Sequence, residues 1–331
     1  MNYCVNPACG YPENPARAKV CHFCESTLLL RDRYRVTKAL GQGGFGATFL
    51  ATDLTLPNKP NCVLKQLRPT LHTPSFLEMA QVLFEREALT LKKIGNHSQI
   101  PQLLDYFEES QRFYLVLEYI PGLTIQQKIK QGGVFKEVQV KQFLNKMLPL
   151  LEYIHSQQVI HRDIKPANII YRQSDQQWIL IDFGSVKDKI IHPRTDSSSG
   201  QTALTAYSVG TPGYAPPEQI AMRPVYASDI YALGATCIYL FTGKSAIDFR
   251  NYSSTGERIW YQDLVISEAF TKIIQKMMAN SMRDRYHSAT EVMQALSVIP
   301  DADISTPAKN NSSSKPLWKN ILPNGKRHFW N

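Results

Sequence analysis

The most distinctive motif in this chain of 331 residues is His161-Arg162-Asp163-Ile164-Lys165-Pro166-Ala167-Asn168. It follows a helical apolar pattern at Val140–His155 and precedes a strand-like run, Trp178–Ile181, that ends directly at Asp182-Phe183-Gly184. An isolated Asp-Phe-Gly triplet is usually a simple turn. Its place shortly after Asn168 argues against a turn here, because it brings a second carboxylate to a strand end, where a metal site can form.

A glycine-rich segment, Gly41-Gln42-Gly43-Gly44-Phe45-Gly46, lies between the strand-like runs Tyr34–Leu40 and Ala47–Thr52. Glycines lack a Cβ atom, so backbone amides in such a hairpin can approach phosphate oxygens. A dinucleotide-binding fingerprint of the same spacing would open a helix, whereas this segment continues as a strand. Taken alone, the segment leaves two interpretations open, a phosphate-binding hairpin and a plain glycine-rich turn.

Lys65 ends the strand-like run Cys62–Lys65, whose apolar residues would hold its stem while the ammonium reaches into a cleft. An apolar stripe at helical spacing follows, formed by Phe84, Ala88 and Leu91. Glu87 projects near the middle of this stripe, and a carboxylate on the inward face of a helix requires a cationic partner. The pattern predicts an ion pair between Lys65 and Glu87, with a purely structural salt bridge as the alternative.

On these motifs, found in this order, the chain resembles the eukaryotic-type (Hanks-type) protein kinase family over nearly all of residues 34–298. The resemblance implies an α+β bilobal protein kinase fold, with a small β-rich N-lobe and a helical C-lobe. It also implies that the chain binds ATP with Mg²⁺, for which Mn²⁺ can substitute. A lysine at the position of Lys165 is what serine/threonine kinases show, so the implied substrates are serine and threonine hydroxyls of proteins.

The family pattern gives each motif a role in phosphate transfer. Asp163 would accept the proton of the substrate hydroxyl, and Lys165 would neutralise charge on the transferred phosphoryl. Asn168 and Asp182 would hold Mg²⁺. Lys65, oriented by Glu87, would reach the α- and β-phosphates of the nucleotide.

The same resemblance extends to the adenine pocket and the glycine loop, which make up the predicted ATP-binding set. Leu117 would lie at the back of the pocket, and backbone groups of Glu118 and Ile120 would read the adenine edge. Thr48 is a departure, because the family commonly has valine there, and it adds a hydroxyl to the pocket. The remaining members of the set are Gly41, Gln42, Gly43, Gly44, Phe45, Gly46 and Lys65.

The segment 210–218 resembles the family's substrate-docking segment, with Thr211 typical of kinases that act on serine or threonine. The usual Ala-Pro-Glu begins with proline here, which preserves its last two residues. The resemblance implies that Glu218 pairs with Arg285 and that Asp229 holds the backbone of the catalytic loop. Both roles are architectural.

The polar segment between Gly184 and Gly210 is rich in hydroxyl groups and is long enough to be mobile. Because Arg162 directly precedes Asp163, a phosphate in this segment could pair with its guanidinium. We predict autophosphorylation at Thr205, which lies as far before Thr211 as activating threonines do in similar bacterial kinases. The alternative is that these hydroxyls only make the loop soluble.

Four cysteines lie close together near the N-terminus, in a segment with too few apolar residues to form its own core: Cys4, Cys9, Cys21 and Cys24. Two close pairs of thiolates are what a tetrahedral Zn²⁺ site requires, so we predict a structural zinc in a zinc-ribbon-like module. A redox or disulfide role remains open. The arrangement also resembles the four-cysteine kinases of cyanobacteria, in which such a module precedes the catalytic domain.

Composition separates a cysteine-rich N-terminal segment and a polar tail from a folded middle. Together with the resemblance, this predicts a four-cysteine module at 1–26, a linker at 27–33, a protein kinase catalytic domain at 34–298 and a flexible basic tail at 299–331. The longest apolar run, Ile230–Phe241, is too short to span a bilayer and is predicted to be a buried core helix. No signal-peptide pattern precedes the cysteines, so we expect a cytoplasmic protein.

The net charge of +9 leaves a second function class to weigh. The tail's aromatic residues, which lie among its basic residues, could stack on nucleic acid bases. The remaining charge is scattered, so a solvated tail, or a surface for a protein or acidic lipid, is favoured over nucleic acid. The cysteine module could bind its own partner. A pseudokinase scaffold normally lacks a metal-binding or base residue, and this chain has all of them. A small-molecule kinase usually lacks a substrate-docking segment, and this chain has one.

Overall fold

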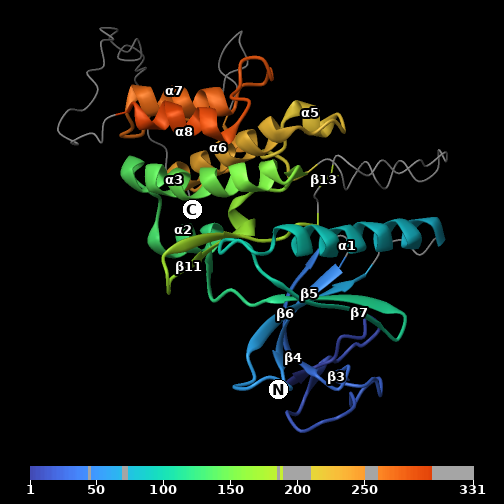
Figure 1. The fold of residues 1–331 in the computed structure, drawn as a ribbon. Helices are drawn as coiled ribbons and strands as arrows, with labels where there is room; N and C mark the ends of the chain where they lie inside the picture. The colour runs from blue at the N-terminus through green and yellow to red at the C-terminus, as the bar shows by residue number, and fades with distance from the viewer. Residues whose placement is uncertain (44–45, 69–73, 185–186, 189–209, 250–259, 300–331) are drawn as a thin grey trace, which may run out of the picture. The chain divides into compact units, whose positions relative to one another are not determined.

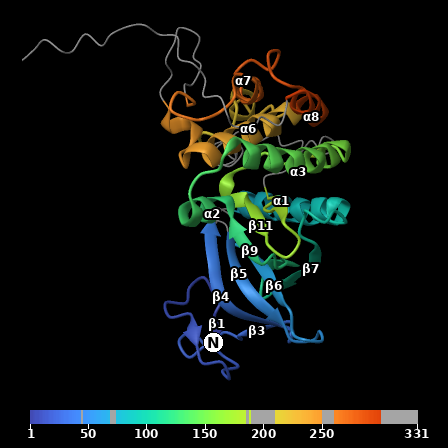
Figure 2. The ribbon, with the colours of Figure 1, turned by 90° about the vertical axis from the view of Figure 1, so that its left-hand side faces the viewer.

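The structure is a computed structural model of the chain and describes residues 1–43, 46–68, 74–184, 187–188, 210–249 and 260–299. Its described part contains a small β-rich lobe and a larger helical lobe, shown in two orientations in Figures 1 and 2. This confirms the two-lobed α+β fold expected from the sequence. Three predicted features lie outside the described residues: the loop residues Gly44 and Phe45, the phosphosite Thr205, and the tail from residue 300 onward.

The N-lobe is built on an antiparallel sheet in the order β3-β4-β5-β6-β8-β7. Its strands are β3 (Leu29–Leu30), β4 (Tyr34–Gly43), β5 (Gly46–Asp53), β6 (Asn61–Leu67), β7 (Leu103–Glu109) and β8 (Arg112–Glu118). Helix α1 (Pro74–Ile94) packs on one face through Phe84 and Ala88, against Leu67 and Leu115. A separate apolar core, which includes Phe49, covers the opposite face. Both faces of the sheet therefore carry apolar contacts, although β5 alternates between buried and half-buried residues.

The C-lobe is mainly helical. Its helices are α2 (Ile125–Gly132), α3 (Glu137–Ser156), α5 (Pro217–Ile220), α6 (Tyr226–Thr242), α7 (Glu268–Met277) and α8 (Ala289–Ser297), with short 3₁₀ turns η1 (Pro166–Asn168) and η2 (Ala246–Asp248). Strands β9 (Gly122–Thr124), β11 (Ile169–Arg172) and β12 (Gln177–Leu180) form a small sheet, and β10 (Val159–Ile160) pairs with β13 (Lys187–Asp188). These elements carry the catalytic-loop motifs to the edge of the lobe.

The longest apolar run of the sequence forms α6, as predicted. Residues 227–238 of this helix are all buried, so apolar side chains surround it instead of lying on one face. The helix ends at Gly243, which has φ 68° and donates its N–H to the carbonyl of Tyr239. A left-handed glycine is a common helix terminator because it lacks a Cβ atom. No helix in the described part of the chain is long and apolar enough to cross a membrane.

The cysteine-rich segment packs on the N-lobe sheet and belongs to the same compact unit. Its strands β1 (Asn2–Tyr3) and β2 (Glu13–Asn14) pair antiparallel, and Figures 1 and 2 place it at the side of the sheet away from the C-lobe. Val5 lies in the same apolar core as Phe49, and the rings of Tyr3 and Phe49 are 5.9 Å apart. The four segment boundaries given above stay a prediction.

Candidate active site

A cavity of about 590 Å³ brings together Lys65, Asp163, Asn168 and Asp182, which lie far apart in the sequence. The glycine loop contributes Gly41, Gln42 and Gly46 to its wall. A second cavity of about 530 Å³ shares Lys65, Asn168 and Asp182 and is also lined by Leu117, Glu118, Ile120 and Thr48. The predicted phosphate-binding, metal-binding and adenine-binding residues of the described chain therefore line adjoining cavities.

Lys65 reaches the cavity because strand β6 alternates between two environments. Cys62, Leu64 and Gln66 are buried, with Cys62 and Leu64 in the core below the sheet, and Lys65 points to the other side. At the start of β5, Gly46 faces this strand so closely that a Cβ atom would lie 2.5 Å from the carbonyl oxygen of Gln66. Glycine is therefore required there for the two strands to pair.

The ammonium of Lys65 lies between two carboxylates. Its Nζ atom is 2.5 Å from Oε1 of Glu87 on α1 and 2.7 Å from Oδ1 of Asp182. The charge of Lys65 lowers the pKa of Asp182 from 3.8 to about 2, against the opposing effect of burial. Burial disfavours the charge of Lys65 as well, but Asp182 and Glu87 outweigh it and raise its pKa. Lys65 and Asp182 are therefore charged at neutral pH.

The catalytic-loop stretch converges on the carboxylate of Asp163. Asn168 Nδ2 and Lys165 Nζ lie 2.8 and 2.7 Å from Oδ2, and the Thr211 hydroxyl donates to Oδ1 at 2.7 Å. Lys165 also donates to the Thr211 hydroxyl at 2.8 Å. Because the amide N–H₂ of Asn168 faces Asp163, its Oδ1 atom is left for another ligand. Both Asn168 and Asp182 thus present oxygen atoms to the cavity, which is the donor type that Mg²⁺ prefers.

Asp229, in the first turn of α6, holds the backbone of this loop. Its carboxylate accepts N–H bonds from His161 at 2.9 Å and from Arg162 at 2.8 Å, and it lies 3.0 Å from Nε2 of His155. Although the carboxylate is fully buried, the bond from His155 and the neighbouring donors lower its pKa. Arg162 has φ 70° and Asp182 has φ 66°, so two backbone positions of the site adopt a conformation that non-glycine residues rarely take.

Two residues of this framework were not singled out from the sequence. The side chain of Gln219 donates to the carbonyl of Arg162 at 2.7 Å, and His155 pairs with Asp229 as described above. Both are buried polar side chains. A signal for His155 was present, because it ends the predicted helix directly before the catalytic stretch, whereas nothing in the sequence separates Gln219 from a surface glutamine.

Residues 34–296 match the protein kinase domain, which spans both lobes and all of the cavity residues described above. The chain belongs to the protein kinase family. Serine/threonine-protein kinase B of Synechocystis sp. is 55% identical over 296 residues, which is 89% of this kinase and 52% of that protein. Serine/threonine-protein kinase PknA of Nostoc sp. is 45% identical over 270 residues, 81% of this kinase and 47% of the relative.

Both of these relatives are named serine/threonine kinases, which agrees with the Hanks-type resemblance that the sequence motifs indicated. Serine/threonine-protein kinase C of Synechocystis sp. adds a third match, 42% identical over 308 residues and covering 90% of this kinase. The kinase covers 54% of that protein's length. The chain thus spans about half the length of the curated relatives it matches, and the activity of the whole protein is treated as a proposal below.

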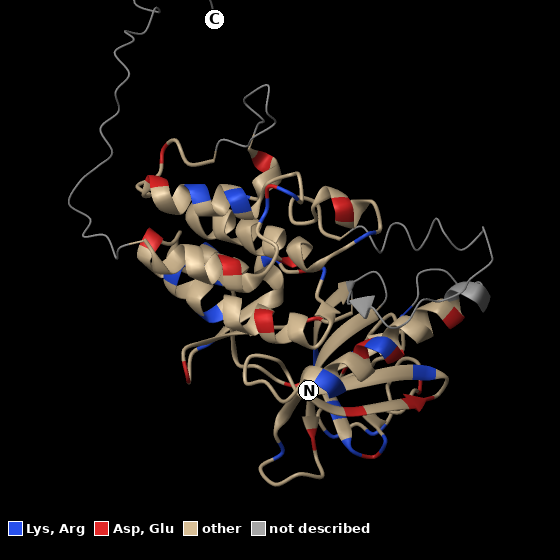
Figure 3. Cartoon of the chain, turned by 45° about the horizontal axis from the view of Figure 1, so that its top comes forward, with Lys and Arg blue, Asp and Glu red and all other residues tan. Residues whose placement is uncertain are grey.

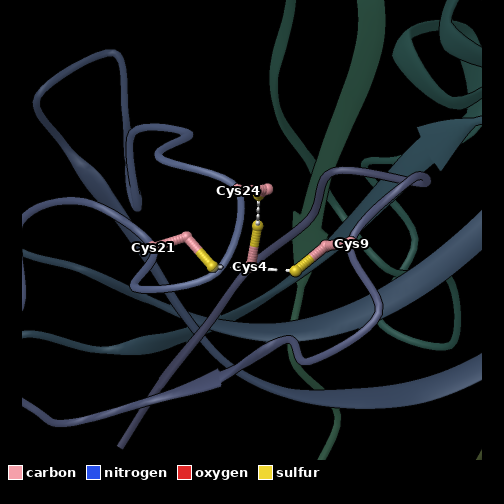
Figure 4. Close-up of side chains that lie close together, drawn as sticks. All are labelled: Cys4, Cys9, Cys21 and Cys24. Atoms are coloured by element: carbon pink, nitrogen blue, oxygen red, sulfur yellow. Dashed lines mark hydrogen bonds between the residues drawn. The ribbon is translucent and has the colours of Figure 1, made fainter.

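The sulfur atoms of the kinase's four N-terminal cysteines converge on one point (Figure 4). All four Sγ atoms lie within 4.8 Å of one another, and the pairs Cys4–Cys24 and Cys9–Cys21 are each separated by 3.6 Å. Sulfurs held tetrahedrally about 2.3 Å from a zinc ion are about 3.8 Å apart, whereas a disulfide needs about 2.05 Å. The separations fit a four-thiolate metal site better than a disulfide pair.

Hydrogen bonds also favour the thiolate form at part of this cluster. Burial raises the pKa of Cys21, but backbone N–H groups of Cys24 and Phe23 outweigh it and lower the pKa to about 6. Ser26 lowers the pKa of Cys24. Thiolates are the form that binds a metal. Burial raises the pKa of the other two thiols, Cys4 and Cys9, so the fit to Zn²⁺ rests on the separations of the four sulfur atoms.

Charge on the kinase surface is mixed in sign. Figure 3 shows lysine and arginine positions interspersed with aspartate and glutamate positions on both lobes of the described chain. Three ion pairs link neighbouring residues of opposite charge: Arg172–Asp175, Lys141–Glu137 and Lys272–Glu268. A nucleic-acid site would require basic residues gathered on one face. The described part of the chain intersperses the two signs of charge instead.

Proposed function

We propose that this chain transfers the γ-phosphate of ATP to serine and threonine hydroxyls of proteins. The observation that supports this best is the meeting of Lys65, Asp163, Asn168 and Asp182 around one cavity. A pseudokinase scaffold is the second candidate, but every acid, base and oxygen ligand that the reaction needs is present. The direct test is transfer of labelled phosphate from ATP to a protein substrate with Mg²⁺ present, and absence of transfer would overturn the proposal.

ATP and Mg²⁺ are the cofactors that a protein kinase domain uses. In this chain Asp182 and Asn168 would hold the cation through oxygen atoms, and Lys65 would hold the nucleotide phosphates. The metal would neutralise charge on the phosphates when bound. Glu87 keeps Lys65 in place, because its Oε1 atom already contacts Nζ of Lys65. Leu117 and the backbone of Glu118 and Ile120 would hold the adenine ring.

The chemistry assigned to this chain is a proton transfer at one carboxylate. Asp163 would orient the substrate hydroxyl and accept its proton as the oxygen attacks the γ-phosphate. Lys165, 2.7 Å from Asp163, would stabilise charge on the transferred group. Thr211 touches both residues, so the docking segment contacts the proposed base directly. A substrate seated on that segment would present its hydroxyl beside Asp163.

We further propose that the cysteine cluster holds one structural Zn²⁺. Metal analysis of the purified, reduced protein should find about one zinc per chain, because four thiolates at tetrahedral separations satisfy the ion fully. Cys21→Ser should lose the metal and lower the thermal unfolding midpoint of the N-terminal part, since such a segment folds around its ion. Cys62→Ser serves as the control and should keep the metal, because Cys62 lies in the sheet core. A reduced wild-type protein without zinc rules the site out.

We propose a cytoplasmic location, because the four-thiolate zinc site proposed above needs its cysteines reduced. The cysteine module and the basic tail would offer surfaces for further partners.

Activation by autophosphorylation at Thr205 remains a proposal that follows from the resemblance and from Arg162. Thr205→Ala should lower the initial rate of substrate phosphorylation about tenfold after preincubation with ATP, because the loop would lose a phosphate that pairs with a guanidinium. Phosphosite mapping by mass spectrometry gives the second readout. Ser198→Ala is the matched control. An unphosphorylated wild-type loop, with equal rates for the two variants, would reject the assignment.

A further inference from the structure

The contact between the cysteine-rich segment and the N-lobe reaches the strand that carries Lys65. Arg68 directly follows β6. Its Nη2 atom donates to the carbonyl oxygen of Val5 at 2.6 Å, and its Nε atom donates to Oε1 of Gln66 at 2.5 Å. Its guanidinium also lies 5.2 Å from the centre of the Phe49 ring. One side chain therefore joins the cysteine-rich segment to the end of β6.

The segment holds the Val5 carbonyl in a fixed place. Val5 lies in the loop between Cys4 and Cys9, and its side chain is buried in the sheet core. The N–H of Cys4 donates to the carbonyl of Pro12 at 2.7 Å. The side chain of Asn6 donates to the Ser26 hydroxyl at 2.9 Å. Because Val5 is buried and both of its neighbours, Cys4 and Asn6, are hydrogen-bonded to other parts of the segment, the carbonyl offers Arg68 a fixed partner.

The connection from Val5 through Arg68 to Gln66 reaches Lys65 along strand β6, in which Lys65 and Gln66 are neighbours. Gln66, which accepts from Arg68, is fully buried and donates to the Tyr114 hydroxyl at 2.8 Å. Successive strand residues point to opposite faces, so a displacement of Gln66 also displaces Lys65 on the cleft side. The described hydrogen-bonding partners of Arg68 are both neutral oxygens. Loss of either would leave a half-buried cation poorly solvated, which makes this connection costly to break.

We propose that Arg68 is a positioning residue for nucleotide binding, which sets Lys65 against Glu87 and Asp182 by joining the Val5 carbonyl to the end of β6. The proposal rests on the function proposed above for Lys65. It gives the cysteine-rich segment a part in the active site, although none of its residues lines the two described cavities. The segment would support Lys65 through the N-lobe sheet, from the face opposite the cleft.

A double-mutant cycle on ATP affinity tests this inference. Binding of a fluorescent ATP analogue with Mg²⁺ is measured for the full chain and for Arg68→Gln, Lys65→Ala and the double variant. Arg68→Gln should weaken binding about tenfold, because a small displacement of a binding group has a large effect. The double variant should bind no more weakly than Lys65→Ala, because Arg68 acts through that lysine. A purely structural role would give additive losses, and additivity overturns the proposal.

Two further variants separate positioning from folding. Arg112, on the neighbouring strand β8, donates from Nη2 to Oδ1 of Asn6 in the same loop at 3.3 Å. Arg112→Gln removes this bond and should leave ATP affinity within about twofold of the wild-type value. Arg68→Lys keeps the charge but not the fork of donors, and should weaken binding about threefold even if Arg68→Gln does not fold. Equal losses for Arg112→Gln and Arg68→Gln contradict the inference, as does wild-type affinity in both Arg68 variants. If Lys65→Ala binds ATP normally, this inference fails, whereas a wild-type protein that binds the analogue but transfers no phosphate would overturn the proposed function instead.

Discussion

Replacing Asp163 with alanine should lower the rate of phosphate transfer about a thousandfold, because it removes the proposed base for the substrate hydroxyl. The affinity for ATP should change little, since Lys65, Asp182 and the adenine pocket are untouched. The rate is measured as initial transfer of labelled phosphate to a protein substrate at saturating ATP and Mg²⁺. A fall in kcat without a matching change in the KM for ATP is the expected signature.

The control for this experiment is a carboxylate outside the cavity. Asp175 pairs with Arg172 at 2.7 Å and is partly exposed, so Asp175→Asn should keep the wild-type rate. Asp163→Asn is a second test, because it keeps the shape and the bond from Thr211 but cannot accept a proton. If either Asp163 variant retained more than about a tenth of the wild-type rate, another group would have to serve as the base.

The sequence predicted the parts of the site that depend on short strings of residues. Asp163, Lys165 and Asn168 are separated by a few positions, so their mutual geometry is largely local. The helical stripe around Glu87 predicted its inward face, and the structure places its carboxylate against Lys65. Periodicity alone was sufficient there, because 3.6 residues per turn fixes which side chains share a face.

Contacts that depend on tertiary packing could not be predicted in this way. The bond from Gln219 to the Arg162 carbonyl joins two loops, and no local pattern distinguishes that glutamine. Likewise, the segment 27–33 reads as a linker, yet Leu29 and Leu30 form the edge strand β3 of the N-lobe sheet. Two residues are too few for a visible alternation, so the neighbouring strand β4 decides their conformation.

Arg285→Ala should lower the free energy of unfolding by about 3–5 kcal/mol, because it leaves the carboxylate of Glu218 buried without its cation. The two side chains are almost fully buried, and Nη1 of Arg285 lies 2.6 Å from Oε1 of Glu218. Arg285 also donates to the carbonyl of Ala227 at 3.0 Å. Urea unfolding followed by tryptophan fluorescence measures the change, with a thermal midpoint lower by roughly 10 °C.

The exposed pair Lys272–Glu268 provides the matched control, and Lys272→Ala should leave the unfolding midpoint unchanged. The paired variant Glu218→Gln with Arg285→Met should recover much of the loss, since it removes both charges together. The effect also reaches catalysis, because Gln219 follows Glu218 and holds the Arg162 carbonyl beside Asp163. Arg285→Ala should therefore reduce the transfer rate below the unfolding temperature as well. An equal loss of stability in Lys272→Ala and Arg285→Ala would show that burial of the pair is not what stabilises this junction.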